Sequence, residues 1–152
     1  MKKHLIALIA SIALASNALA QTTVIDPWVR ATVPQQSASG AFMQLRSADS
    51  ARLVAASSPV AASVQLHKME MVGQMMKMRE VDGVDLPAGA TVSLASGGYH
   101  VMLFGLKHQL KEGDVVPLSL VVERNKGKRE TIAVNAVVKP LTYAGASAPM
   151  HR

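Results

Sequence analysis

Four residues with metal-binding side chains stand at a distinctive spacing in the middle of the chain: His67, Met78, His100 and Met102. Ten residues separate His67 from Met78, twenty-one separate Met78 from His100, and one separates His100 from Met102. Two imidazoles and two thioethers form a soft, neutral donor set, and thioether ligands select Cu(I). Since the chain contains no cysteine, no thiolate competes for a soft metal. The spacing therefore predicts a His2Met2 site that holds one Cu(I) per chain.

Each of these side chains also has a simpler interpretation. Methionine often fills irregular gaps in a core, so the five methionines between residues 69 and 78 could form a hydrophobic stripe. The joint spacing of two His and two Met favours the metal site. We expect Met69 and Met76 to lie on the ligand face as auxiliary metal positions. Near the C-terminus, Met150 and His151 form a second candidate pair, which could bind Cu(II) weakly.

The two histidines should make metal binding depend on pH. An imidazole must lose its proton before it can bind a metal ion. We therefore expect copper affinity to fall below about pH 6.5, the ordinary pKa of histidine.

The surrounding sequence reads as short β-strands separated by turns rich in Pro, Gly and Asp. We expect strands at residues 22–29, 40–46, 52–57, 63–71, 75–81, 91–94, 100–106, 117–124 and 130–139. Many short strands at this spacing predict an all-β fold, a barrel or sandwich of mostly antiparallel strands.

A hairpin would bring the first two ligands together. A tight turn at Val72–Gly73 sets His67 opposite Met78, and opposed residues have Cβ atoms roughly 4.5–5.5 Å apart. His100 and Met102 share one face of a third strand because residues two apart point the same way. Val72 is poorly suited to this turn, since a two-residue hairpin loop needs positive φ at its centre. The predicted pairing therefore depends on this turn.

Residues 1–20 have the pattern of a signal peptide. Lys2 and Lys3 precede an apolar run, and Ala18-Leu19-Ala20 supplies the small residues of a cleavage site before Gln21. The run is too short to span a bilayer, and without cysteine we expect no lipid anchor. We therefore expect export to the periplasm, a copper-binding β domain at 21–140, and a flexible tail at 141–152, where small residues dominate.

Charge and composition exclude several classes of function. Two of the sixteen Lys and Arg residues lie in the signal, which leaves fourteen against ten Asp and Glu, a net charge of +4. Four bases cluster at 124–129, either as a solvated hairpin tip or as a patch that steers an acidic partner. Nucleic acid is not expected as a partner, because aromatic residues make up only 3% of the chain. No nucleophile or acid–base cluster accompanies the four ligands, so we expect no enzyme.

The segment from His67 to Met102 resembles the periplasmic copper chaperones of the PCu(A)C family, formerly a domain of unknown function. It matches that family's pattern at all four ligand positions. Similar segments also occur at 28–31, 76–79, 86–89, 97–100, 102–106 and 111–114. Where relatives often have Asn-Gly, this chain has Val72-Gly73.

The resemblance implies a cupredoxin-like β domain that binds one Cu(I) near its surface. It further implies delivery of that copper to the CuA centre of cytochrome c oxidase subunit II, directly or through a Sco-type protein. A blue-copper electron carrier is excluded because such sites need a cysteine thiolate. A copper storage or resistance protein without an oxidase acceptor stays open as the alternative. A purely structural or adhesive β-module is the alternative that involves no metal.

Overall fold

The computed structural model describes residues 21–145, which form ten strands and one short 3-10 helix. The elements are β1 (Thr22–Arg30), β2 (Ala38–Ser47), β3 (Ala51–Ser57), β4 (Ala61–Val72), β5 (Met75–Glu80), β6 (Val84–Leu86), β7 (Thr91–Leu94), β8 (Tyr99–Leu106), β9 (Val115–Arg124), η1 (Asn125–Gly127) and β10 (Lys128–Lys139). The nine predicted strands are all present, with ends within two residues of expectation, so the all-β prediction is confirmed. Strand β6 is the one strand in this part of the chain that the sequence did not predict.

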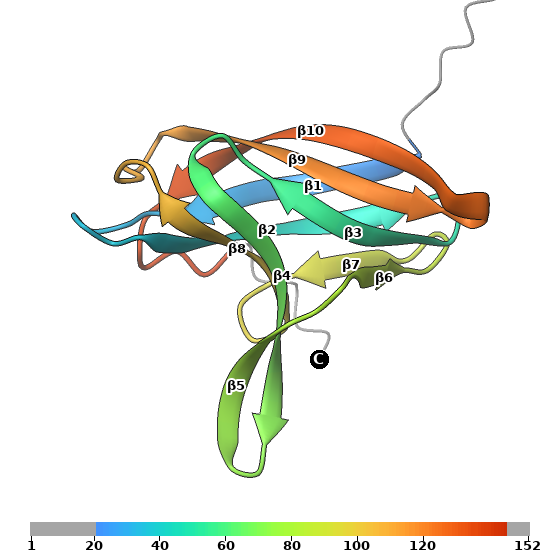
Figure 1. Cartoon of the computed structure of the whole chain (residues 1–152), viewed down its shortest axis with the longest axis horizontal. Coiled ribbons are helices and arrows are strands. Elements are labelled where there is room, and N and C mark those ends of the chain that lie inside the picture. Colours follow the sequence, from blue (N-terminus) through green and yellow to red (C-terminus); the bar gives the residue numbers. More distant parts are fainter. Residues whose placement is uncertain (1–20, 146–152) are drawn as a thin grey trace, which may run out of the picture.

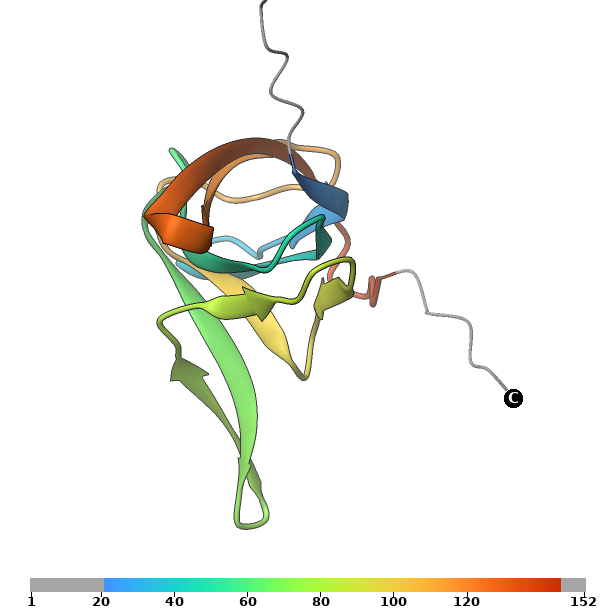
Figure 2. The ribbon, with the colours of Figure 1, turned by 90° about the vertical axis from the view of Figure 1, so that its right-hand side faces the viewer.

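All ten strands belong to one rolled sheet. Its order is β5-β4-β8-β2-β1-β10-β9-β3-β6, and β7 pairs with the free part of β2. Neighbouring strands are antiparallel except β1 and β10, the first and last strands of the domain, which pair in parallel. The sheet curls into a barrel-like body, as Figure 2 shows, but its outer strands β5 and β6 do not pair with each other. The roll is therefore open.

The core lies inside this roll and follows the two-residue period of the strands. In β9, Val116, Leu118, Leu120 and Val122 are buried, and the residues between them are exposed or half-buried. Strand β8 contributes Val101 and Leu103 to the same core.

Strand β4 extends beyond the body. Its residues from Ala61 to Lys68 pair with β8, and those from His67 to Val72 pair with β5. Strand β5 pairs with β4 alone. The result is a hairpin that projects away from the rolled sheet (Figure 1).

The turn at the tip of this hairpin consists of Gly73 and Gln74, so the predicted turn at Val72–Gly73 is wrong by one residue. Val72 lies in the strand and pairs with Met75. Gly73 has a φ of +64°, whereas Gln74 has a negative φ. Positive φ at the first central residue alone is the requirement of a type II′ turn, for which glycine is preferred. The shift keeps β-branched Val72 in extended backbone, which it favours.

The basic cluster lies at the β9–β10 turn, well apart from the β4–β5 hairpin (Figure 1). Two of its four cations are paired: Arg124 with Glu130 at 3.7 Å and Arg129 with Glu123 at 3.2 Å. This pairing favours the interpretation of a solvated hairpin tip.

The segment after β10 begins against the body. The ring of Tyr143 contacts the Trp28 indole edge-on at 4.9 Å between centroids. The predicted signal peptide, and the tail residues Met150 and His151, lie outside the described residues.

Candidate metal centre

Strands β5, β4 and β8 place the four predicted ligands on one face of the sheet. His67 in β4 lies opposite His100 in β8, and Met102 lies opposite Gln65, two residues from His67. Met78 in β5 lies opposite Met69, two residues from His67 in the other direction. Because opposed residues in an antiparallel pair point to the same face, all four side chains lie on one side.

The predicted pairing of His67 with Met78 is wrong. His67 faces Glu80, Met78 faces Met69, and Met76 faces Met71. Moving the turn by one residue shifts each strand pairing by two. A shift of two preserves the face of every side chain, whereas a shift of one would have reversed it. The error therefore changed the partners and left the ligand face intact.

His100 and Met78 make the closest contact within the site. The Nδ1–H of His100 donates to the carbonyl oxygen of Gly98 at 3.1 Å, which leaves a lone pair on Nε2 of the neutral ring. Nε2 lies 3.0 Å from the Sδ of Met78. Two ligand atoms that each bind the same metal ion at roughly 2.0–2.3 Å are separated from each other by only slightly more than this 3.0 Å. The imidazole is only 6% exposed, so it is held in this orientation.

His100, Met78 and Met102 line one hollow in the surface, together with Met69; we call it the metal hollow. Arg30 and the short segment from Ala38 to Phe42 form its far wall. The structure thus brings three of the four predicted ligands together and adds Met69, which the sequence analysis treated as auxiliary. Met76 does not line the hollow and lies farther out along the hairpin.

His67 lies beside this hollow rather than in its wall. Its ring is 5.9 Å from that of His100 and 5.6 Å from that of Phe104, measured between centroids. Its Nε2–H donates to Oε1 of Gln65 at 2.8 Å. Nδ1 is buried and has no hydrogen-bond partner among residues 21–145. A buried nitrogen lone pair without a partner is costly in a folded protein, and a metal ion would satisfy it.

The surroundings of His67 keep it neutral. Burial lowers the pKa of His67, the nearby imidazole of His100 lowers it further, and Glu80 opposes both effects. Only the neutral imidazole binds a metal ion. The environment of His67 therefore favours the form that can act as a ligand.

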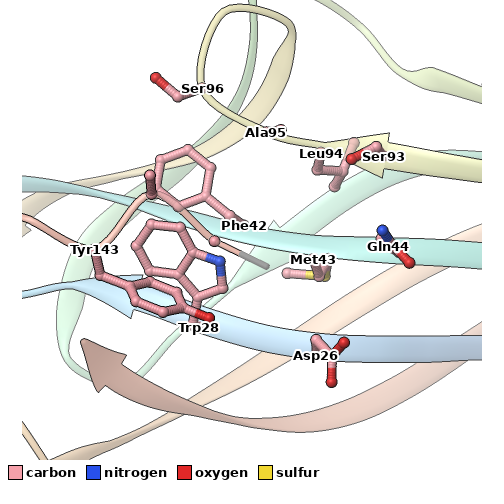
Figure 3. A pocket seen from close by; sticks show the side chains of 12 residues that line it. Asp26, Trp28, Phe42, Met43, Gln44, Ser93, Leu94, Ala95, Ser96 and Tyr143 are labelled. Atoms are coloured by element: carbon pink, nitrogen blue, oxygen red, sulfur yellow. The ribbon is translucent and has the colours of Figure 1, made fainter. Parts of the chain in front are cut away.

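An aromatic cluster lies next to the metal hollow. The Phe42 ring lies 6.3 Å from the ring of His100 and 4.5 Å from the Trp28 indole. Figure 3 shows Trp28 between Phe42 and Tyr143, at a small pocket next to the hollow. Phe42 and Ser96 line both. In the sequence, the Trp28–Ala31 segment stands out only through the resemblance, and no pattern in it indicates its place beside the site.

Gly40 leaves room for this arrangement. It lies opposite Met102 in the strand pairing of β2 and β8. A Cβ atom on Gly40 would come within 2.8 Å of Cζ of Phe42. Any larger residue would displace the ring that lies against His100.

Arg30 adds a positive charge to the wall of the metal hollow. Its guanidinium lies 5.4 Å from the centroid of Phe42 and 5.7 Å from that of Trp28, within reach of a cation–π interaction. It forms no ion pair within the described part of the chain.

The donor chemistry of the hollow suits a soft metal. Between residues 21 and 145, no group of three or more His, Cys, Asp or Glu side chains is arranged to hold a metal ion. A four-donor site on this face therefore has to use thioethers, which favour Cu(I) over harder cations.

Fold and donor set together define an all-β domain with a His/Met site on one face of its sheet, and solved structures share that fold. The copper-bound PCuAC domain from PmoF2 superposes with a TM-score of 0.63 at 23% identity, over 81% of this chain and 96% of that one. The solution structure of CuI-DR1885 from Deinococcus radiodurans superposes with a TM-score of 0.57 at 34% identity, over 83% of each chain. These likenesses confirm the predicted cupredoxin-like β fold.

Residues 22–138 match the model of the LpqE-like family, described as "Putative lipoprotein LpqE-like", and the chain belongs to this family. "Putative lipoprotein Lxx21020" of Leifsonia xyli subsp. xyli is 35% identical over 98 residues, which are 64% of this chain and 59% of that protein. The matched part thus spans little more than half of the relative. Although the family is named for lipoproteins, the 152 residues include no cysteine. Within residues 21–145, no helix is long and apolar enough to cross a membrane.

Proposed function

We propose that this protein is a Cu(I) carrier that holds one ion between His67, Met78, His100 and Met102. The contact between Nε2 of His100 and Sδ of Met78 carries the proposal, since both donors point to one place in the metal hollow. The unpartnered Nδ1 of His67, beside the hollow, supports His67 as the fourth ligand. A relative of 34% identity has been solved in its CuI form, which supports copper as the cargo.

The ligand set suits transport more than storage or catalysis. All four donors are neutral, so a bound Cu(I) keeps its single charge, and an exposed Met78 leaves the ion accessible to an acceptor. We infer that the protein works in the periplasm as a metallochaperone, not as an enzyme. The proposed destination is the CuA centre of cytochrome c oxidase subunit II, reached directly or through a Sco-type protein.

A competition titration tests the copper site. The mature protein is titrated with Cu(I) against a chromogenic Cu(I) chelator, and we expect one tightly bound equivalent. The double variant Met78→Leu, Met102→Leu keeps the apolar volume and removes two ligands, so affinity should fall at least about tenfold for each lost ligand, or about 1.4 kcal/mol. Met75→Leu, a change on the opposite face of the hairpin, serves as the control. Unchanged affinity in the double variant would contradict the site.

A transfer experiment tests the destination. The Cu(I)-loaded protein is mixed with an apo CuA domain, with and without a Sco-type partner, and the CuA absorption is followed under reducing and then oxidising conditions. Formation of the CuA chromophore supports the metallochaperone. Retention of copper in every mixture would favour the alternative, a storage or resistance protein.

A further inference from the structure

The β4–β5 hairpin carries a row of sulfur atoms that extends beyond the four proposed ligands. On the ligand face of the hairpin, Met69 lies opposite Met78, and Met71 lies opposite Met76 nearer the tip. We call these four methionines the sulfur face. Every residue of β4 and β5 on this face between the metal hollow and the turn is a methionine.

Packing does not account for the outer pair. Met71 is 65% exposed and Met76 is 50% exposed, so neither fills a core. Exposed strand positions usually hold polar or β-branched residues. Methionine differs from the other apolar side chains in its polarisable thioether, which binds soft metals. The distinctive chemistry that these two positions offer is therefore that of the sulfur atom.

The outer pair has a geometry that can hold an ion. Directly opposed residues in an antiparallel ladder have Cβ atoms roughly 4.5–5.5 Å apart. Two flexible thioethers at this separation can approach one Cu(I) from opposite sides. Along the strand, the inner pair Met69 and Met78 follows after two residues, roughly 7 Å away, and both of its members line the metal hollow.

The other face of the hairpin has a different chemistry. Lys68 lies opposite Arg79 and Glu70 opposite Lys77. The guanidinium of Arg79 holds the carboxylate of Glu70 through two hydrogen bonds at 3.0 and 3.1 Å. Met75 is the one methionine on this face, next to the turn. One face of the hairpin thus carries mainly charged, ion-paired residues, and the other carries methionines.

We propose that Met71 and Met76 form an outer, thioether-only Cu(I) site through which the ion reaches and leaves the metal hollow. This inference rests on the proposed function, because the inner site is its destination. The ion moves by ligand exchange: a bond to Met69 or Met78 forms as a bond to Met71 or Met76 breaks. Copper stays in the Cu(I) state throughout, so the step needs no oxidant or reductant.

Methyl resonances of the methionines test the outer site directly. In protein labelled with 13C at the methionine ε-methyl groups, the first equivalent of Cu(I), added as a weak acetonitrile complex, should shift Met78 and Met102. A second equivalent should shift Met71 and Met76 and leave Met75 unchanged. Equal responses of Met75, Met71 and Met76, or none, would overturn the inference. Failure of the first equivalent to move Met78 and Met102 would instead contradict the proposed function.

Exchange kinetics test whether the outer pair is used. The double variant Met71→Leu, Met76→Leu retains the apolar surface and removes only the sulfur atoms. We expect its final Cu(I) affinity to match that of the wild type, while transfer of Cu(I) to and from a small chelator slows about tenfold. Met75→Leu, at a position of similar exposure on the charged face, should exchange at the wild-type rate. Wild-type rates in the double variant would show that the outer methionines serve only as apolar surface.

Discussion

At the scale of single residues, the proposed copper site uses two imidazoles whose orientations are fixed by hydrogen bonds. His100 is fixed by its hydrogen bond to the Gly98 carbonyl, which directs the lone pair of Nε2 toward Met78. His67 is fixed by Gln65 in the opposite sense, with Nδ1 left unpartnered. Each ring thus uses one nitrogen in a hydrogen bond within the fold and has the other available for the proposed ion. Such hydrogen bonds from metal-binding histidines raise the basicity of the ligand and set its orientation.

The lowered pKa of His67 makes the stability of the copper-free protein depend on pH. The unfolded chain takes up a proton at about pH 6.5, whereas burial keeps the folded residue neutral to lower pH. The contribution of neutral His67 to the free energy of unfolding is therefore complete above about pH 6.5. It is lost as the pH falls toward the pKa of His67 in the folded protein. The free energy of unfolding, measured with urea, should fall less between pH 7.5 and pH 5.5 in His67→Gln than in the wild type. An equal loss would assign the pH dependence to other groups.

Gly40 should control the copper site without being a ligand. In Gly40→Ala, the new methyl group displaces the Phe42 ring and with it the support of His100. We expect copper affinity to fall by about tenfold, with the fold retained. Arg46→Ala, at an exposed position of β2 that does not line the metal hollow, provides the control for a general change in β2. Equal affinity in Gly40→Ala and the wild type would contradict a supporting role of Phe42.

At the scale of secondary structure, the strands could be predicted closely, while the pairing could not. Alternation and turn residues located nine strands, because burial of one face leaves a clear signal in the sequence. The hairpin register depended on one dihedral angle at Gly73, which the sequence pattern does not show. Met69 was predicted only as an auxiliary position and Phe42 was not predicted at the site, because their proximity to His100 arises from pairing between distant segments.

The turn at Gly73 should hold the outer pair of the sulfur face in register. At a φ of +64° a β-branched residue is strained by roughly 1–2 kcal/mol, whereas asparagine tolerates this region. In Gly73→Val we expect the turn to move and the nuclear Overhauser contacts between Met71 and Met76 to weaken. In Gly73→Asn they should persist. Intact contacts in both variants would show that the strands, and not the turn, determine the register.

At the scale of the whole molecule, β8 connects the proposed copper site to the core. His100 and Met102 point to the ligand face, and Val101 and Leu103, which are fully buried, point into the roll. The alternation of one strand thus serves both ligand placement and stability.

This division predicts that stability and copper affinity can be separated. Leu103→Ala should lower the free energy of unfolding by about 2–5 kcal/mol, because it opens a cavity in the core. Copper affinity of the folded fraction should change little, since Met102 keeps its partners Gly40 and Gln65. Urea unfolding and chelator competition on the same sample measure the two effects. A parallel collapse of affinity would show that site and core are coupled.

The projecting hairpin divides the ligand set unequally. His67, His100 and Met102 belong to β4 and β8, which pair with each other, whereas Met78 sits on β5, whose single neighbour is β4. The hairpin therefore leaves the body near Lys68, where β8 stops pairing with β4. Deflection of its tip changes the distance from Met78 to His100 and leaves the other three donors in place. We expect Met78 to be the first of the proposed ligands that an acceptor detaches, and residual dipolar couplings of β5 with and without Cu(I) would reveal such a displacement.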